Sequence, residues 1–270
     1  MKGKTCVVTG ATSGIGKETA VELARAGARV AIVCRTRDRG ERALAEVRQR
    51  CGGDVTLFVA DFASQRAIRA LAARLVATLP RVDVLVNNAG LVMRERVLTE
   101  DGLETTFAVN HIGYFLLARL LGPKLTTRAH RSGTLRFDDL MGARGFDGWK
   151  AYAQSKLANV VFTYELARRL TGTGVTANCL HPGVIATNFG HTAPPLLRLG
   201  IWIARPFMKS SARGAETSIY LASSPEVEGV SGKYFVNRRP ARSSDESYDP
   251  AVGARLWKAS EELTAASDVP

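Results

Sequence analysis

The first half of the chain alternates short apolar runs with longer segments of helical periodicity. The apolar runs are Cys6–Val8, Val30–Cys34, Val55–Ala60 and Val82–Val86. The amphipathic segments between them are Lys17–Arg25, Arg39–Arg50 and Ser64–Leu79. Strands that alternate with helices form parallel sheets, and strands that are apolar throughout are buried on both faces. The pattern therefore predicts a doubly wound α/β fold, with helices on both faces of a mostly parallel sheet.

The second half shows fewer such elements. Two further apolar runs, Val175–Leu180 and Lys233–Val236, are predicted strands. The polar stretch Arg238–Pro250 predicts a loop, and a last helix is expected over about residues 251–264. Neither a repeat nor a low-complexity linker divides the 270 residues, of which 46% are hydrophobic. That length and composition suit one core, so we expect a single domain over residues 1–270.

The chain is strongly basic, with a formal net charge of +12. Its basic residues stand singly in amphipathic segments, without a long basic run or a stretch interleaved with aromatic residues. This scatter disfavours nucleic-acid binding. A positive charge also suits an anionic cofactor.

The cysteines and the lengths of the apolar runs indicate the compartment. Cys6, Cys34 and Cys179 lie inside apolar runs, and the absence of a CxxC pair favours buried reduced thiols over disulfides or metal ligands. The first predicted strand begins almost at the first residue, which leaves no room for a signal peptide. The longest apolar stretches are interrupted before they could span a bilayer. We expect a cytoplasmic protein.

A glycine-rich stretch, Gly10–Gly16, joins the first predicted strand to the first predicted helix with the spacing G-x-x-x-G-x-G. Glycines permit a tight turn and let the backbone approach a pyrophosphate, and the N-terminus of the following helix attracts phosphates. The alternative is an ordinary glycine-rich turn. The position of the stretch after the first strand of a β-α-β unit favours a nucleotide site.

The end of the second predicted strand indicates which nucleotide the site would take. An acidic residue there would bind the ribose 2′-hydroxyl of NAD, whereas an arginine would bind the 2′-phosphate of NADP. The strand ends in Cys34-Arg35-Thr36, with no acid. Arg35, with Lys17 as a second positive charge, therefore favours NADP(H). The alternative is that both are solvated surface charges.

Two further motifs carry chemistry. Asn87-Asn88-Ala89-Gly90 follows the fourth predicted strand, and Tyr152 and Lys156 stand four residues apart in a helical stretch. Residues with this spacing lie on one face of a helix. A nearby ammonium stabilises a phenolate and lowers the pKa of the tyrosine, which suits a general acid and base.

In these motifs, taken together and in this order, the chain resembles the short-chain dehydrogenase/reductase family, and its retinol dehydrogenase-like branch in particular. The branch resemblance is carried by Gly14–Ala20, Phe137–Leu140, Ala151–Val160 and His181–Val184. It extends over nearly the whole chain. It implies a Rossmann-type fold, a nicotinamide cofactor and hydride transfer to or from an alcohol or carbonyl carbon.

The resemblance also implies roles for individual residues. Tyr152 would exchange a proton with the substrate oxygen, Lys156 would hold the nicotinamide ribose, and Asn110 would anchor a proton-relaying water. The implied cofactor contacts, besides Arg35, Tyr152 and Lys156, are Gly10, Thr12, Ser13, Gly14, Ile15, Gly16, Asp61, Phe62, Asn88, Ala89, Gly90, Val109, Pro182, Gly183 and Thr187. Singly they have plainer alternatives, such as helix packing for Asn110 or a strand-end turn for Asp61.

The family also has a serine beside the tyrosine, at the end of a fifth strand that the apolar pattern does not reveal here. Compared with the family spacing, about ten residues are absent after Asn110, the length of a connector plus a short strand. Three explanations stand: a deletion variant, residues omitted from the sequence, or residues 125–128 drawn into the sheet with Thr127 at the serine position. Because a lost central strand would leave backbone groups unpaired, a catalytically impaired NADP-binding module is the alternative to an enzyme.

The segment over about residues 186–212 is apolar with interspersed arginine and lysine. It could form a lid over a pocket for a lipophilic alcohol, aldehyde or ketone. It could also lie on a membrane surface, or pack on the core or on a second subunit of a homo-oligomer. The sequence as a whole predicts an NADP(H)-dependent oxidoreductase that acts on a lipophilic alcohol or carbonyl compound.

Overall fold

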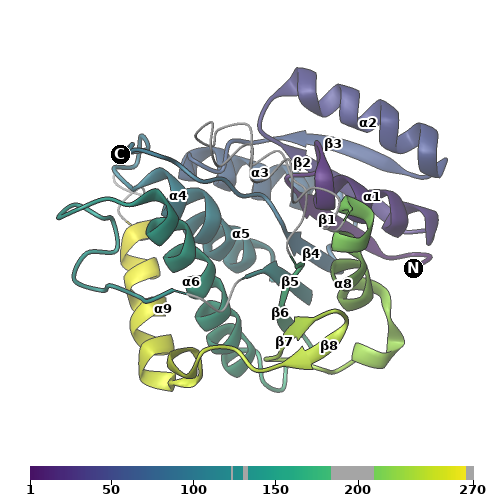
Figure 1. Cartoon of the computed structure of the whole chain (residues 1–270). Coiled ribbons are helices and arrows are strands. Elements are labelled where there is room, and N and C mark those ends of the chain that lie inside the picture. Colours follow the sequence, from purple (N-terminus) through teal and green to yellow (C-terminus); the bar gives the residue numbers. More distant parts are fainter. Residues whose placement is uncertain (123, 130–132, 184–209, 266–270) are drawn as a thin grey trace.

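A central sheet lies between two layers of helices (Figure 1). The computed structural model describes residues 1–122, 124–129, 133–183 and 210–265, with the backbone alone for 124–128. Within these residues the strand order is β3-β2-β1-β4-β5-β6-β7-β8. The strands are β1 (Thr5–Thr9), β2 (Arg29–Cys34), β3 (Val55–Val59), β4 (Val84–Asn87), β5 (Lys124–Arg128), β6 (Ala177–His181), β7 (Tyr234–Val236) and β8 (Arg239–Ala241). All pair in parallel except β8, so the predicted Rossmann-type α/β fold is confirmed.

The helices cover both faces of the sheet (Figure 1). One layer consists of α1 (Gly14–Arg25), α2 (Arg37–Cys51) and α8 (Ser211–Ser223). The other consists of α3 (Gln65–Thr78), α5 (Gly113–Leu121), α6 (Gly148–Arg169) and α9 (Pro250–Ala265). The short α4 (Thr105–Phe107) and a π-helical turn, η1 (Ala108–Ile112), lead directly into α5. Two 3₁₀ turns, η4 (Pro225–Val227) and η5 (Asp245–Tyr248), complete the described elements.

The core is split in two by the sheet. Successive side chains of a strand point to opposite faces. Val7 and Leu85 therefore pack under the layer of α3, α5 and α6, whereas Val8 and Val86 pack under the layer of α1. Burial on both faces is what the continuous apolar runs predict.

The fifth strand, which the apolar pattern does not reveal, is present. Gly122 adopts a left-handed backbone (φ 58°) and ends α5, so that β5 begins two residues later. In β5, Thr127 lies opposite Asn87 of β4 and opposite Cys179 of β6. Of the three explanations left open by the sequence, the structure matches the one in which residues 125–128 are drawn into the sheet. The buried strands β4 and β6 both need backbone partners, and this requirement brings a segment without an apolar run into the ladder.

The polar stretch predicted as a loop over 238–250 is only partly one. β8 pairs with β7 across a two-residue turn, in which Asn237 and Arg238 have φ values of 51° and 64°. Positive φ at both positions is typical of the turn whose twist suits a hairpin. The η5 turn follows, and α9 occupies the place of the expected last helix.

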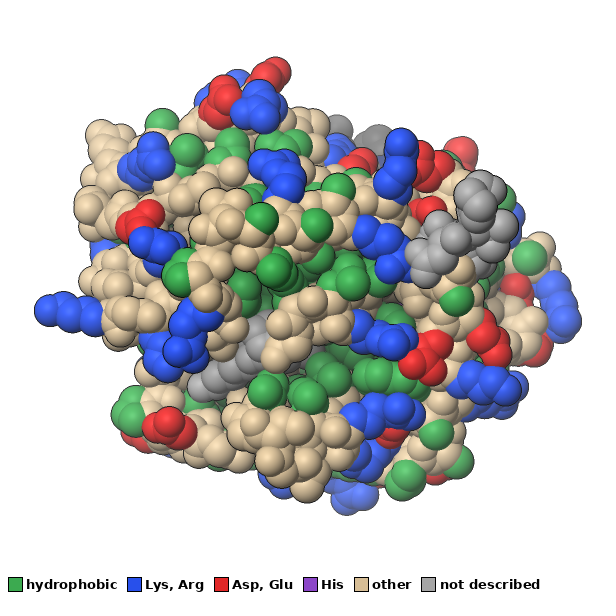
Figure 2. Space-filling view, turned by 180° about the vertical axis from the view of Figure 1, so that it is seen from behind, with side chains coloured by type: hydrophobic (Ala, Val, Ile, Leu, Met, Phe, Trp, Pro, Cys, Tyr) green, Lys and Arg blue, Asp and Glu red, His purple; other side chains and the backbone are tan. Residues whose placement is uncertain are grey.

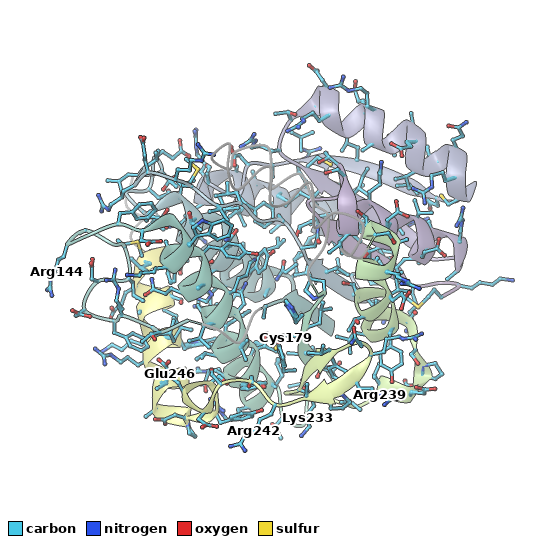
Figure 3. The ribbon with its side chains drawn as sticks, viewed as in Figure 1. Arg144, Cys179, Lys233, Arg239, Arg242 and Glu246 are labelled. Atoms are coloured by element: carbon cyan, nitrogen blue, oxygen red, sulfur yellow. The ribbon has the colours of Figure 1, made fainter. Side chains whose placement is uncertain are left out.

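The cysteines are free thiols, and three of them are buried. Cys179 lies on β6 inside the molecule, whereas Arg144, Arg239 and Arg242 lie at its periphery (Figure 3). Burial raises the pKa of the Cys179 thiol, and it raises the pKa of the Cys34 thiol to about 11. These thiols therefore stay protonated and unreactive at neutral pH.

The surface carries its positive charge in scattered positions. Figure 2 shows Lys and Arg side chains distributed over one face, with apolar side chains exposed between them. None of the helices in the described part of the chain has the length and hydropathy needed to cross a bilayer. The segment predicted as a lid over about 186–212 lies, apart from its last three residues, outside the described residues.

Candidate active site

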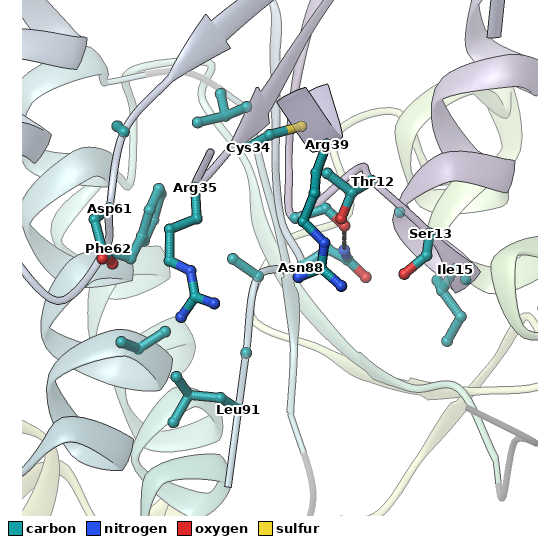
Figure 4. A pocket seen from close by; sticks show the side chains of 18 of the residues that line it. Thr12, Ser13, Ile15, Cys34, Arg35, Arg39, Asp61, Phe62, Asn88 and Leu91 are labelled. Carbon is teal, nitrogen blue, oxygen red and sulfur yellow. Dashed lines mark hydrogen bonds between the residues drawn. The ribbon is translucent and has the colours of Figure 1, made fainter. Parts of the chain in front are cut away.

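A cavity of about 550 Å³ opens at the carboxyl ends of the first strands (Figure 4). Ligands of doubly wound sheets bind at this edge. They bind between two neighbouring strands whose crossover connections run in opposite directions. The predicted cofactor residues that line it are Gly10, Thr12, Ser13, Gly14, Ile15, Gly16, Arg35, Asp61, Phe62, Asn88, Ala89, Gly90 and Val109. The fold thus brings together positions that are a hundred residues apart in the sequence.

Two glycines of the loop are needed for close packing. A Cβ on Gly10, which has φ 67°, would lie 2.6 Å from the Cα of Ala89. A Cβ on Gly16 would lie 2.3 Å from Nδ2 of Asn88. The loop therefore rests directly on the Asn88-Ala89 segment. This packing holds the N-terminus of α1, with its unpaired N–H groups and positive dipole end, at the cavity wall, where it suits a phosphate group.

Side-chain hydrogen bonds of Thr9 and Asn88 connect the carboxyl ends of β1 and β4. The hydroxyl of Thr9 accepts hydrogen bonds from the backbone N–H groups of Asn88 (2.9 Å) and Ala89 (3.0 Å). In return, Nδ2 of Asn88 donates to the carbonyl oxygens of Thr9 (2.8 Å) and Gly10 (3.2 Å). Thr9 is a structural support for the site that the sequence analysis missed.

The positive charge at the cavity differs from the prediction at one position. Arg35 and Arg39 both line the cavity, and Figure 4 shows their side chains within it. Lys17, the expected second charge, instead forms an ion pair with Glu46 of α2, with Nζ and Oε1 2.5 Å apart. Arg39 supplies the second guanidinium because it stands in the first turn of α2. Arg39 could have been predicted from the sequence, because it stands only four residues after Arg35.

The predicted acid–base pair lies on α6. The ammonium of Lys156 is buried, with Nζ 5.5 Å from the ring centroid of Tyr152 and 5.6 Å from that of Tyr114. A Cβ on Gly90 would lie 3.4 Å from the same Nζ, so Gly90 passes close to the ammonium. The hydroxyl of Tyr114 donates to the carbonyl oxygen of Ala89. The structure thus places Lys156 against the segment that lines the cavity and Tyr152 beside Lys156, although neither residue lines the cavity itself.

Asn110 lies in the π-helical turn η1 and binds the same segment. Its Oδ1 accepts a hydrogen bond from the N–H of Leu91, and its Nδ2 donates to the carbonyl of Leu91, both at 2.9 Å. Its own carbonyl accepts from Nδ2 of Asn159 at 2.9 Å. π-Helical turns occur often at functional sites. Here the turn presents the side chain of Asn110 to the backbone of Leu91, while the water predicted for Asn110 stays a prediction.

A model of the family described as short chain dehydrogenase matches residues 4–195. The chain belongs to the short-chain dehydrogenase family. Retinol dehydrogenase 14 of Homo sapiens is 43% identical, with 97% of this chain and 86% of that protein covered. Retinol dehydrogenase 13 of Homo sapiens is 42% identical, with 97% and 84% covered. The predicted retinol dehydrogenase-like resemblance is confirmed, and the chain is an oxidoreductase of this family.

The chain is also similar in sequence and fold to solved structures. An uncharacterised protein of Mycobacterium paratuberculosis is 32% identical with a TM-score of 0.79, over 98% of this chain and 94% of that chain. A variant actinorhodin polyketide ketoreductase with NADPH is 25% identical with a TM-score of 0.68, over 86% and 94%. The fifth strand is present, Lys156 lies beside Tyr152, and Asn110 and Lys156 both approach Gly90. These observations do not favour the catalytically impaired alternative.

Not every predicted position reaches the cavity wall of this short-chain dehydrogenase. Pro182 and Gly183 follow β6 at the same edge of the sheet, where Gly183 has φ 87°, but they do not line the cavity. Thr187 lies outside the described residues. Thr127 is placed by its backbone at the carboxyl end of β5, opposite Asn87. Ser211, at the start of α8, lines the cavity and was not predicted.

Proposed function

We propose that this short-chain dehydrogenase uses NADP(H) and transfers hydride between the nicotinamide and a lipophilic alcohol, aldehyde or ketone. The cofactor choice rests on one observation: Arg35 and Arg39 both line the cavity. Two guanidinium groups match a 2′-phosphate in charge and hydrogen-bond geometry. No acid stands at the tip of β2, where it would bind a 2′-hydroxyl. The related ketoreductase structure that holds NADPH is consistent with this choice.

The lipophilic substrate is supported by two observations. The relatives at 42% and 43% identity are named retinol dehydrogenases. Beyond Gly90, the cavity is lined by the apolar side chains of Leu91 and Val92. Apolar lining with a few placed polar groups is typical of sites for small apolar molecules.

The residues present fit a nicotinamide dinucleotide, because the glycine loop, the N-terminus of α1 and the two arginines line one cavity. When bound, the nicotinamide supplies or accepts the hydride. Tyr152 would give its hydroxyl proton to the substrate oxygen in reduction and take it back in oxidation. The buried ammonium of Lys156 would stabilise the phenolate that remains.

The cofactor proposal is tested by measuring kcat/KM with NADPH and with NADH. Arg35→Ala and Arg39→Ala are each expected to lower kcat/KM for NADPH by about tenfold or more, because a charge-assisted bond to the phosphate is lost. Activity with NADH should change much less. Arg37→Ala is the matched control, since Arg37 is exposed, pairs with Glu41 at 3.4 Å and does not line the cavity. A wild-type preference for NADH would overturn the proposal.

The acid–base assignment is tested with Tyr152→Phe. Loss of the hydroxyl should lower kcat by about a hundredfold or more, since no proton can reach the substrate oxygen from this position. Binding of NADPH, followed by fluorescence titration, should persist. Full activity of Tyr152→Phe on a lipophilic aldehyde would show that another group carries the proton.

A further inference from the structure

Trp149 is an exposed aromatic residue on the helix that carries Tyr152. Its side chain is 61% exposed, although α6 buries an unbroken run of residues from Gln154 to Leu166 that begins five residues later. Tryptophan is among the most buried residue types on average, because its large ring gains much when it leaves water. An indole left in solvent at this place would therefore gain free energy by covering a ligand.

The position of Trp149 is fixed by its backbone, not by its ring. The carboxylate of Asp147 caps α6 and accepts hydrogen bonds from the N–H groups of Trp149 (2.9 Å) and Lys150 (3.0 Å). Gly148 packs so tightly on the segment after β4 that a Cβ would lie 2.1 Å from the carbonyl oxygen of Met93. Since these anchors do not involve the indole, the ring can be changed without losing them.

The indole lies against the proposed acid–base residue. The rings of Trp149 and Tyr152 meet nearly edge to face, with centroids 6.3 Å apart and an interplanar angle of 86°. Lys156 approaches the ring of Tyr152 at 5.5 Å. At spacings of three and four residues, the three side chains follow one another along one face of α6. Trp149 is exposed, Tyr152 is half-buried and Lys156 is buried, so Trp149 is the outermost of the three.

The apolar segment after β4 packs against the start of α6. Leu91, Val92 and Met93 are half-buried, and the first two line the cavity. The contact between Gly148 and Met93 holds this segment against the first turn of α6. The first turn of α6, which carries Trp149, thus packs on the segment whose Leu91 and Val92 line the cavity.

We propose that Trp149 determines substrate specificity by packing its indole against the flat, conjugated or aromatic part of a carbonyl substrate whose oxygen is bound by Tyr152. This inference rests on the proposed function. A planar unsaturated framework can stack on or meet the edge of the indole, whereas a short aliphatic chain covers little of it. The side chain acts on substrate recognition and takes no part in proton or hydride transfer.

Two variants and two substrates of different shape test the proposal. With NADPH, Trp149→Ala should lower kcat/KM for trans-cinnamaldehyde by about tenfold, mainly through KM, and for propanal by no more than about twofold. Trp149→Phe should fall between wild type and Trp149→Ala. The pH profile of kcat should stay unchanged, because Tyr152 and Lys156 keep their places. Val76→Ala, which truncates a 65% exposed apolar side chain on α3, is the matched control.

Equal losses for both aldehydes, or a shifted pH profile, would overturn the proposal, since the indole would then position Tyr152 instead of recognising substrate.

A binding measurement separates this failure from failure of the proposed function. Cinnamamide, which is not reduced, should quench the indole fluorescence of the wild type in the presence of NADP⁺, and Trp149→Phe should lose that quenching. If no carbonyl compound is turned over, the proposed function fails while the titration still decides whether Trp149 meets such a ligand. Identical quenching in Trp149→Phe would refute the inference.

Discussion

The side-chain amide of Asn110 donates a hydrogen bond to the hydroxyl of Ser155, with 3.0 Å between Nδ2 and Oγ and both side chains fully buried. The same amide also forms two hydrogen bonds with the backbone of Leu91. The hydroxyl of Ser155 donates in turn to the carbonyl oxygen of Tyr152 at 2.7 Å. These bonds link the cavity-lining segment after β4 to the turn of α6 that carries Tyr152.

Ser155 is therefore predicted to be a positioning residue. Ser155→Ala leaves Nδ2 of Asn110 with one partner fewer and should reduce the free energy of unfolding by about 1–3 kcal/mol. It should also lower kcat by about tenfold, because small displacements of reacting groups cost rate, while KM for the aldehyde changes little. Thermal unfolding and steady-state kinetics measure the two effects.

Ser223→Ala is the matched control for Ser155→Ala. The hydroxyl of Ser223 also donates to a backbone carbonyl of its own helix, that of Ile219 at 2.7 Å, but α8 carries it away from Tyr152. An equal drop of kcat in both variants would mean that lost stability, not lost positioning, explains the effect.

Gly10 is predicted to be needed for tight cofactor binding. In Gly10→Ala the new methyl group would have to fit at a positive φ of 67° and 2.6 Å from the Cα of Ala89. The loop must then move off the Asn88-Ala89 segment. We expect the Kd for NADPH, measured by titration, to rise about tenfold or more as the backbone amides leave their places.

Gly52→Ala separates backbone strain from this overlap. Gly52 has a similar φ of 61° at the end of α2, yet nothing lies within 4 Å of the position of its Cβ. The control should therefore lose about 1–2 kcal/mol of stability and keep its affinity for NADPH. Weakened binding in Gly52→Ala, comparable with that in Gly10→Ala, would contradict the role given to close packing.

Stability should depend on pH through His111. This side chain is fully buried between Oδ1 of Asn159 (3.2 Å from Nδ1) and Oγ of Ser260 (3.0 Å from Nε2). Burial lowers its pKa to about 4 from an ordinary value of 6.5. Between these values the unfolded chain binds a proton that the folded chain does not. The contribution of neutral, buried His111 to the free energy of unfolding is therefore complete above pH 6.5, and it is lost as the pH falls towards 4.

The measurement compares the free energy of unfolding of the wild type and of His111→Gln between pH 7 and pH 4. The wild type should lose up to about 3 kcal/mol more than the variant over this interval. The variant shows how much stability is lost through other groups, such as carboxylates. Glu165 is one of them: burial raises its pKa, but its hydrogen bonds to Arg168 and Arg169 lower the pKa by more. Parallel pH curves would show that His111 does not titrate as its burial predicts.

Local patterns were enough to predict much of this protein. Continuous apolar runs indicated strands buried on both faces, and the sheet has β1 to β4 where these runs stand. The glycine spacing indicated the cofactor cavity, because backbone freedom at Gly10 and Gly16 is a property of the residues themselves. Likewise, a spacing of four residues places Tyr152 and Lys156 on one helix face in any α-helix.

Other features depend on groups distant in the sequence, and only the tertiary structure decided them. β5 has no apolar run of its own, and it is its pairing with β4 and β6 that makes it a central strand. Glu46 draws Lys17 away from the cavity, and the start of α2 brings Arg39 into it. The contact of Trp149 with Tyr152 and the link from Ser155 to Asn110 join elements whose meeting depends on the packing of the whole domain. Motifs thus determined the cofactor chemistry, whereas long-range packing determined which side chains support and border the reacting groups.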